Sequence, residues 1–328
     1  TVAVSSSDTG EATVSPATLT FTEANWNTAQ TVTVTGVNDN NADGHQDYDI
    51  SLSELVVSSK ALDFDGTNDY VDVGDFSLGG NLTFEAWMQY DSRATWSRVF
   101  DFSENGGADD NIWLGLESNS GKISFEVLLG SSKSRLSDGD GGQTSYGQVP
   151  IDGTWIHVAA TISGTAGTTN GTGKLYVNGN LVGTKTNMYV PAVMTRNKQY
   201  LGKSNWNGDS YLDAKMDEFR IWNYVRSQSE ILATMNNTLT GSESGLVAYY
   251  KMNDGSGTSL ADSSSNSNTA TLNNMTDADW VVSGVGPAPE SVDVALHNLD
   301  DDTDVTVAVS SSDTGEATVS PATLTFTE

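Results

Sequence analysis

The stretch YLGKSNWNGDSYLDAKMDEFRIWNYVR, residues 200–226, contains the two patterns from which we infer the fold and the chemistry of this chain. Its second half, Met216 to Tyr224, mixes apolar and polar residues as a β-strand does when one face is buried and the other is wet. Its first half contains a polar loop, residues 204–209, in which amide and carboxylate oxygens flank a tryptophan. Calcium prefers such oxygens, but Asn, Gly and Asp also form ordinary turns, so the loop alone leaves both interpretations open.

Short strands separated by turns account for most of the surrounding sequence. Residues 82–90 and 155–162 alternate apolar and polar positions, and Asn178-Gly179 joins two further runs as a two-residue hairpin. One helix is predicted, because SQSE at residues 227–230 forms a capping box ahead of an apolar stripe. Many short strands and a single helix predict an all-β fold, an antiparallel sandwich.

The charge of the chain excludes several kinds of partner. Lys and Arg number 15 against 43 Asp and Glu, so the formal net charge is −28. Such a polyanion repels phosphate backbones and anionic bilayers, so we expect neither nucleic-acid binding nor membrane insertion, and metal cations are its natural counter-charge. The sequence has no cysteine, which excludes disulfides and thiolate metal sites.

The most specific feature is an exact repeat: residues 1–23, TVAVSSSDTGEATVSPATLTFTE, recur letter for letter as residues 306–328. Identity over this length indicates tandem modules. The first copy continues through runs that alternate like half-buried strands, at residues 31–35 and 48–52. This module resembles the Calx-β/immunoglobulin-like repeats of large bacterial RTX-type adhesins.

The resemblance also implies that the module is interrupted. Adhesin repeats of this kind close on an extended strand and an Asp-rich tail, which appear here only from residue 291 onward. We therefore expect residues 1–57 and 288–305 to form one split module whose late strand pairs with the N-terminal part, and residues 58–287 to form an inserted domain. Residues 306–328 would begin the next module, lack partners within their own chain, and be able to swap with the N-terminal copy of a neighbouring molecule.

Two acidic clusters belong to the split module. Dense carboxylates repel one another unless a divalent cation lies between them, and in the adhesin repeats such clusters bind calcium at module junctions. A solvated acidic turn is the alternative. The candidate calcium ligands of this module are Asp39, Asp43, Asp47, Asp300 and Asp302.

The inserted domain carries six blocks of sequence that resemble, in order, a laminin-G-like jelly roll of the concanavalin A-like lectin superfamily. These blocks are DGTNDYVDVG, LTFEAWM, GTWIHVAATI, LYVNGNLVG, MDEFRIWNYVRSQSEI and GLVAYYKMNDGSGTSLADSSSNSNTATL. The resemblance implies an antiparallel jelly-roll sandwich inserted into a smaller immunoglobulin-like β-sandwich. It is less specific for the ligand, because such domains bind sugars, peptides or proteins, or have no known ligand.

Pentraxins, which are relatives in this superfamily, imply where a calcium site would lie. Their site combines an Asp-Asn pair at the start of one strand with a loop of acids and amides before a later strand. The matching residues here are Asp110, Asn111, Asn205, Asn207 and Asp209. Amides replace most of the acids of the loop, which implies weaker calcium binding. Further candidate ligand-binding residues are Glu104, Asp109, Asp138, Asp140, Tyr146 and Trp206, the last two as surfaces on which a sugar ring can stack.

We therefore expect a calcium-dependent lectin module of a secreted adhesin on the bacterial cell surface. A calcium ion held by protein oxygens can accept two vicinal sugar hydroxyls. The expected partners are glycans of host cells, algae or biofilm matrix, together with neighbouring repeats of the adhesin. The alternatives are a protein-binding, peptide-binding or spacer module and a glycan hydrolase. Hydrolysis is disfavoured because the Glu-x-Asp-x-x-Glu spacing of the superfamily's glucanases is absent and the three histidines are scattered.

Overall fold

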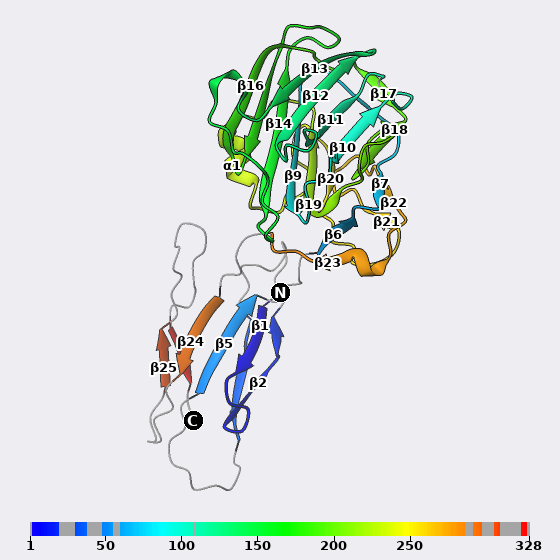
Figure 1. The fold of residues 1–328 in the computed structure, drawn as a ribbon. Helices are drawn as coiled ribbons and strands as arrows, with labels where there is room; N and C mark the ends of the chain where they lie inside the picture. Colours follow the sequence, from blue (N-terminus) through cyan, green and yellow to red (C-terminus); the bar gives the residue numbers. More distant parts are fainter. Residues whose placement is uncertain are drawn as a thin grey trace. The chain divides into compact units, whose positions relative to one another are not determined.

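The computed structural model divides the chain into two compact units, and nearly all the regular secondary structure of their described residues is β-strand (Figure 1). The first unit comprises Thr1–Val57 and Ala288–Glu328, and the second comprises Ser58–Pro287. The residues that the structure describes are 2–19, 30–37, 48–54, 60–107, 109–285, 291–296, 305–308 and 323–326. The candidate calcium ligands of the split module lie outside these ranges; they are Asp39, Asp43, Asp47, Asp300 and Asp302.

The first unit contains a four-stranded antiparallel sheet in the order β24-β5-β1-β3. These strands are β24 (Ser291–Leu296), β5 (Tyr48–Glu54), β1 (Val2–Ser6) and β3 (Thr18–Leu19), and a separate pair joins β2 (Ala12–Ser15) to β4 (Thr33–Gly36). Val4, Leu19 and Ile50 form its small core. The predicted pairing of the late strand with the N-terminal part is confirmed, because β24 pairs with β5 from Ser291 opposite Ser53 to Leu296 opposite Tyr48.

The prediction that residues 306–328 lack partners within the chain is wrong. In this segment β25 (Val305–Ala308) pairs with β26 (Thr323–Phe326) in an antiparallel ladder. The reason is local: the second copy contains the same two strand sequences that pair as β1 and β3 in the first copy, so it forms the same hairpin.

The second unit is a sandwich of two antiparallel sheets, which confirms the predicted fold class. Sheet I has the order β13-β12-β11-β10-β18-β7-β22-β21, and sheet II the order β16-β15-β14-β9-β19-β6-β23, with β20 also paired to β19. The strands of sheet I are β13 (Ser132–Ser137), β12 (Ile123–Leu129), β11 (Ile112–Leu116), β10 (Arg98–Ser103), β18 (Lys198–Leu201), β7 (Tyr70–Asp72), β22 (Ala270–Asn273) and β21 (Ser259–Leu260). Those of sheet II are β16 (Asn180–Met188), β15 (Gly171–Val177), β14 (Ile156–Ser163), β9 (Leu82–Tyr90), β19 (Asp213–Trp222), β6 (Lys60–Asp65), β23 (Trp280–Val282) and β20 (Leu246–Tyr250). A further short pair joins β17 (Met194–Arg196) to β8 (Phe76–Leu78).

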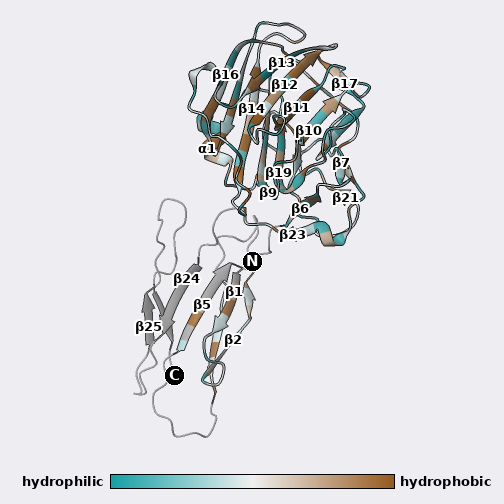
Figure 2. Ribbon diagram, in the orientation of Figure 1, coloured by the Kyte–Doolittle hydropathy of each residue, from teal (hydrophilic) through white to brown (hydrophobic). Residues whose placement is uncertain are grey.

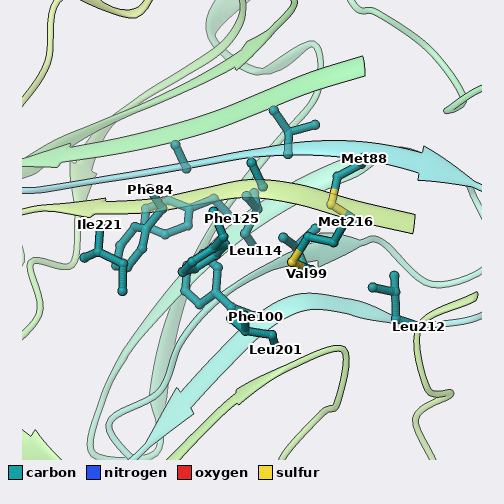
Figure 3. Close-up of a cluster of buried hydrophobic side chains, with 14 of the residues drawn as sticks. Phe84, Met88, Val99, Phe100, Leu114, Phe125, Leu201, Leu212, Met216 and Ile221 are labelled. Carbon is teal, nitrogen blue, oxygen red and sulfur yellow. The ribbon is translucent and has the colours of Figure 1, made fainter. Parts of the chain in front are cut away.

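The core of the second unit lies between the two sheets. Phe84 of β9 stacks on Phe100 of β10 with ring centroids 4.3 Å apart, so the contact joins the sheets directly (Figure 3). Phe125 of β12 packs on the same Phe84 ring at 6.2 Å. The strands of this unit carry both hydrophobic and hydrophilic colours in Figure 2. Since successive residues of a strand face opposite ways, the polar residues that alternate with core residues along these strands point out of the sandwich.

The outer face of sheet II is covered by helix α1 (Gln228–Thr234). Ser227 and Glu230 form the predicted capping box, and Ile231 packs against Ala159 and Tyr176 of the sheet. No helix in the described part of the chain is long and apolar enough to cross a membrane. The helix leaves the outer face of sheet I free to carry other chemistry.

Candidate functional site

A row of polar and aromatic side chains crosses the outer face of sheet I. Its members are opposite one another in successive strand pairs, from β13 to β7: Arg135, Glu126, Trp113, Asp101, Tyr200 and Asp72. Their neighbours along the strands, such as Phe100, Phe102 and Phe125, belong to the core. The alternation of the strands therefore places this row on the opposite face from the core.

Three tryptophan rings surround the Arg98 guanidinium beside Trp113 and Asp101, the two middle members of this row. Its Cζ lies 4.0 Å from the ring centroid of Trp113, 5.5 Å from that of Trp206 and 5.8 Å from that of Trp96. Nη2 of Arg98 donates to Oδ2 of Asp209 at 2.9 Å, which fixes the guanidinium. Trp113 and Arg98 are buried, whereas Trp96 and Trp206 are half-buried. The cluster therefore holds two partly exposed aromatic surfaces in place.

Asp101 connects this cluster to two loops that are distant in sequence. Its carboxylate accepts from Nδ2 of Asn111 at 2.7 Å, and from the backbone N–H and Nδ2 of Asn205 at 3.0 and 3.1 Å. The side chain is fully buried, and burial raises the pKa of Asp101 above its ordinary value although the Arg98 charge opposes the rise. The backbone N–H of Gly107 also donates to the Asn205 carbonyl at 2.9 Å. The β10–β11 loop and the β18–β19 loop are thus joined above Asp101.

The β10–β11 loop gathers three carboxylates, Glu104, Asp109 and Asp110, which we call the acidic trio. One oxygen from each lies within 4.8 Å of the others, and all three residues are half-buried. Three hard oxygen ligands in this arrangement match the preference of calcium. The trio therefore has the donor set for a divalent cation, which would also offset the repulsion among the carboxylates.

Asp110 is held rigidly within the trio. It adopts a left-handed backbone conformation with φ 49°, its backbone N–H donates to the Gly130 carbonyl at 3.1 Å, and its Oδ1 accepts from the Gly130 N–H at 2.9 Å. Nε of buried Arg196 donates to the Asp110 carbonyl at 2.8 Å. Burial lowers the pKa of Arg196 to about 10, with the charges of Asp110 and Glu104 opposing the shift. A non-glycine residue with positive φ is strained by about 1–3 kcal/mol, and such strain is often found at functional sites.

The five residues expected to share one calcium ion have separate roles in the structure. Asp110 belongs to the acidic trio, together with Asp109 and Glu104. Asn111 and Asn205 bind Asp101 instead, and Oδ1 of Asn111 already accepts from the Asp109 N–H at 2.8 Å. Asp209 accepts from Arg98 and from Ser204, at 2.9 and 2.7 Å, and Asn207 is exposed. The β10–β11 and β18–β19 loops do lie together, and the residues that join them are Asp101 and Arg98.

The loop at residues 138–146 is built differently from our expectation. Asp138 is 5% exposed and accepts from Ser145 Oγ and from the backbone N–H groups of Tyr146 and Gly147, at 2.6 to 2.8 Å. Oδ2 of Asp140 accepts from the Ser137 N–H at 2.9 Å. Both carboxylates therefore shape the loop, while Tyr146 is exposed.

A model of the concanavalin A-like lectin/glucanase superfamily matches residues 65–232, just over half of the chain. The chain belongs to this superfamily. No curated protein sequence matches it.

Several solved structures are similar to this chain over half of its length or more. A putative carbohydrate binding protein from Bacteroides ovatus has 18% identity and a TM-score of 0.45, covering 79% of this chain and 68% of that one. The native heptameric SAP-like pentraxin from Limulus polyphemus has 15% identity and a TM-score of 0.40, covering 53% of this chain and 81% of that one. Domain 4 of an extracellular arabinanase from Geobacillus stearothermophilus, in complex with arabinotriose, has 17% identity and a TM-score of 0.39, covering 58% and 81%.

Two further buried acids, Asp217 and Glu218, lie on β19 of sheet II, the opposite sheet from the tryptophan cluster. Asp217 of β19 is 1% exposed, burial raises its pKa to about 8, and Ser283 Oγ donates to it at 2.5 Å. Glu218, the next residue, accepts from Arg220 and from Tyr249 Oη, both at 2.5 Å. These acids are enclosed by protein groups, so a polysaccharide on the surface has no direct access to them.

Proposed function

We propose that residues 58–287 are a carbohydrate-binding module that binds its glycan with the help of calcium. The observation that carries the proposal is the junction at Asp101. There, two partly exposed tryptophans stand beside a loop with three convergent carboxylates, on a sheet face that the helix does not cover.

The aromatic part of this arrangement suits a sugar ring. The faces of Trp96 and Trp206 offer apolar surface for the C–H face of a pyranose, and the Arg98 guanidinium between them limits their movement. Rings that are fixed before the ligand arrives lose less conformational freedom on binding. Exposed Asn207 is available for hydroxyl groups. Arg135 is already paired with Glu126 and Glu117, and its Cζ lies 4.6 Å from the ring centroid of Trp96.

Calcium would be held by the acidic trio and would supply the second part of the recognition. The ion takes six to eight oxygen ligands at roughly 2.3–2.6 Å, so three carboxylates leave coordination positions for water or for two vicinal hydroxyls. The Gly107–Asn205 hydrogen bond brings the trio's loop against the loop of Trp206. A sugar bound to the ion would therefore contact the β18–β19 loop, which carries Trp206.

We further propose that the module belongs to a secreted adhesin of the bacterial cell surface and binds glycans of host cells, algae or biofilm matrix. The exact repeat of residues 1–23 at 306–328 supports a tandem array, and the net charge of −28 suits a protein that uses calcium. The ligands of the split module are then Asp39, Asp43, Asp47, Asp300 and Asp302. A protein-binding or spacer role is the competing function.

A glycan array probed with the purified chain, in calcium and in chelator, tests this function. We expect binding in calcium that is lost with chelator and lost in Trp206→Ala. Tyr146→Ala serves as the matched control, because this exposed tyrosine lies on the 138–146 loop, and it should bind as the unmodified chain does. Loss of binding in Tyr146→Ala alone would move the site to that loop, and an array without any bound glycan would favour the protein-binding or spacer role.

A further inference from the structure

A second group of aromatic and charged side chains lies on the outer face of sheet I, next to the tryptophan cluster. Tyr200 of β18 is opposite Asp101, in the row of polar side chains that crosses this face. Because alternate residues of a strand face the same way, Lys198 shares the outer face with Tyr200. The Tyr70 ring of the neighbouring strand β7 meets the Tyr200 ring edge to face, with centroids 5.3 Å apart. The face that carries the tryptophans thus continues into this second group.

The ammonium group of Lys203 is held over these two rings. Its Nζ lies 3.9 Å from the ring centroid of Tyr70 and 4.6 Å from that of Tyr200, which is a cation–π arrangement. The backbone is fixed on both sides of this lysine. The N–H of Gly202 donates to a β10 carbonyl at 3.2 Å, and the hydroxyl of buried Ser204 donates to a carboxylate of its own loop at 2.7 Å. The charge is therefore in place before a ligand arrives, which lowers the cost of binding.

The cations of this face differ in whether they already have a counter-ion. Arg98 and Arg135 each lie within ion-pair distance of two carboxylates. Among the described residues, neither Lys198 nor Lys203 forms an ion pair with a carboxylate. Burial lowers the pKa of Lys203 below its ordinary value; the charge of Asp72 opposes this effect and the charge of Lys198 adds to it. An anion bound beside the two lysines would offset both causes.

We propose that Lys198, Lys203, Tyr70 and Tyr200 form a subsite for an acidic sugar, whose carboxylate or sulfate group is bound by the two ammonium groups. This inference rests on the function proposed above and names the class of glycan. A lysine ammonium is a compact charge with three donors, and its hydrogen bonds to an anionic oxygen are about twice as strong as those between neutral groups. Burial raises the pKa of Tyr200 to about 12, so its hydroxyl keeps its proton at neutral pH and can donate to a sugar oxygen.

The net charge of −28 limits how many acidic groups the glycan can carry. At physiological ionic strength charges are screened beyond about 8 Å, so a single bound anion responds mainly to the groups that it contacts. A glycan with many acidic groups in succession is repelled by the chain as a whole. We therefore expect ligands in which an acidic sugar is isolated among neutral ones.

Paired glycan probes test this subsite with the full chain in calcium. One pair is an oligosaccharide with a single uronic acid and its carboxyl-reduced form, and the other is a singly sulfated oligosaccharide and its desulfated form. We expect one charged probe to bind about tenfold more tightly than its neutral counterpart, as a hydrogen bond to a charged group provides, and the pair that shows the difference identifies the anion. Lys203→Gln should remove most of this preference, whereas Lys203→Arg, which keeps the charge, should retain it. Lys174→Gln, on β15 of sheet II, removes the same charge from the opposite sheet and should retain the full preference.

Three results would overturn this proposal, and only one of them also counts against the proposed function. Equal binding of charged and neutral probes would remove the acidic subsite and leave the carbohydrate-binding function in place. So would a Lys203→Gln variant that loses affinity equally for both members of a pair, because Lys203 would then only support the loop of Trp206. Binding of neither charged nor neutral probes would overturn the subsite together with the function on which it rests.

Discussion

Oδ1 of Asp101 accepts a hydrogen bond from Nδ2 of Asn205, a residue 104 positions later in the chain, at 3.1 Å. The same carboxylate accepts from Asn111 at 2.7 Å and lies 3.6 Å from Nε of Arg98. The buried carboxylate of Asp101 therefore holds three parts of the site together. These are the β10–β11 loop with the acidic trio, the β18–β19 loop with Trp206, and Arg98. Removal of this carboxylate should affect both the stability of the fold and the shape of the site.

The first prediction is that Asp101→Ala destabilises the chain by about 3–5 kcal/mol. The substitution removes a buried counter-charge 3.6 Å from Arg98, together with the carboxylate that accepts from the Asn111 amide and the Asn205 backbone N–H. Chemical unfolding followed by tryptophan fluorescence measures the change. Asp209→Asn is the matched control, since it removes the other carboxylate of Arg98 but leaves Asp101 in place. An Asp101→Ala variant no less stable than Asp209→Asn would show that Asp101 does not connect the loops energetically.

The second prediction is that calcium raises the melting temperature of the chain and that Asp110→Ala reduces this increase. Binding to the folded state alone stabilises by about 2.7 kcal/mol when calcium is present at one hundred times Kd. Differential scanning calorimetry with and without chelator measures the shift. Asp152→Asn, which changes a carboxylate outside the trio, should retain the full shift. A shift that is the same in Asp110→Ala would place the calcium outside the trio.

The sequence predicted the fold of the second unit better than its site. Alternation at residues 82–90, the hairpin at Asn178-Gly179 and the capping box at Ser227 are local patterns, and each one forms as predicted. Such patterns settle where a strand or helix lies and which residues share a face, because they depend on neighbours in sequence.

The site depends on contacts that no local pattern contains. In the segment RVFDFS, residues 98–103, alternation places Asp101 on the face opposite core Phe100 and Phe102. It would place Arg98 on the face of the phenylalanines, and only the register shift between Arg98 and Phe100 brings Arg98 beside Asp101. It does not indicate that Arg98 pairs with Asp209, 111 positions later, or that three tryptophans surround it. The sequence around Asp138 is ambiguous for a related reason. An aspartate whose carboxylate binds its own loop cannot be distinguished by sequence from one that binds a ligand.

The third prediction concerns pH. Burial raises the pKa of Asp217 to about 8, well above the 3.8 of an exposed aspartate, so the folded state retains a proton that the unfolded state has released. Between about pH 4 and pH 8 the folded chain therefore binds more protons, and the stability contributed by neutral Asp217 is lost as pH rises through this window. Asp217→Asn, which mimics the protonated form, should flatten this decline. Unfolding curves at a series of pH values measure it, and an unchanged slope would mean that Asp217 is ionised in the folded state.

The fourth prediction is that residues 58–287 fold and bind on their own. Their first and last strands are neighbours, since Lys60 of β6 is opposite Val282 of β23, so the two ends of this segment are held side by side by its own sheet. The strands that flank it in the first unit are paired as well, with Ser53 opposite Ser291. Each unit thus has its own ladder at the point of insertion, and neither requires the other to complete it. The isolated segment should unfold cooperatively and show the same glycan profile as the whole chain, with affinities that agree within about twofold, a free-energy difference of roughly 0.4 kcal/mol. Circular dichroism and the glycan array measure these two properties. A segment that folds but has lost its glycans would show that residues of the first unit take part in binding, and a segment that remains unfolded would show that the insertion depends on its host module.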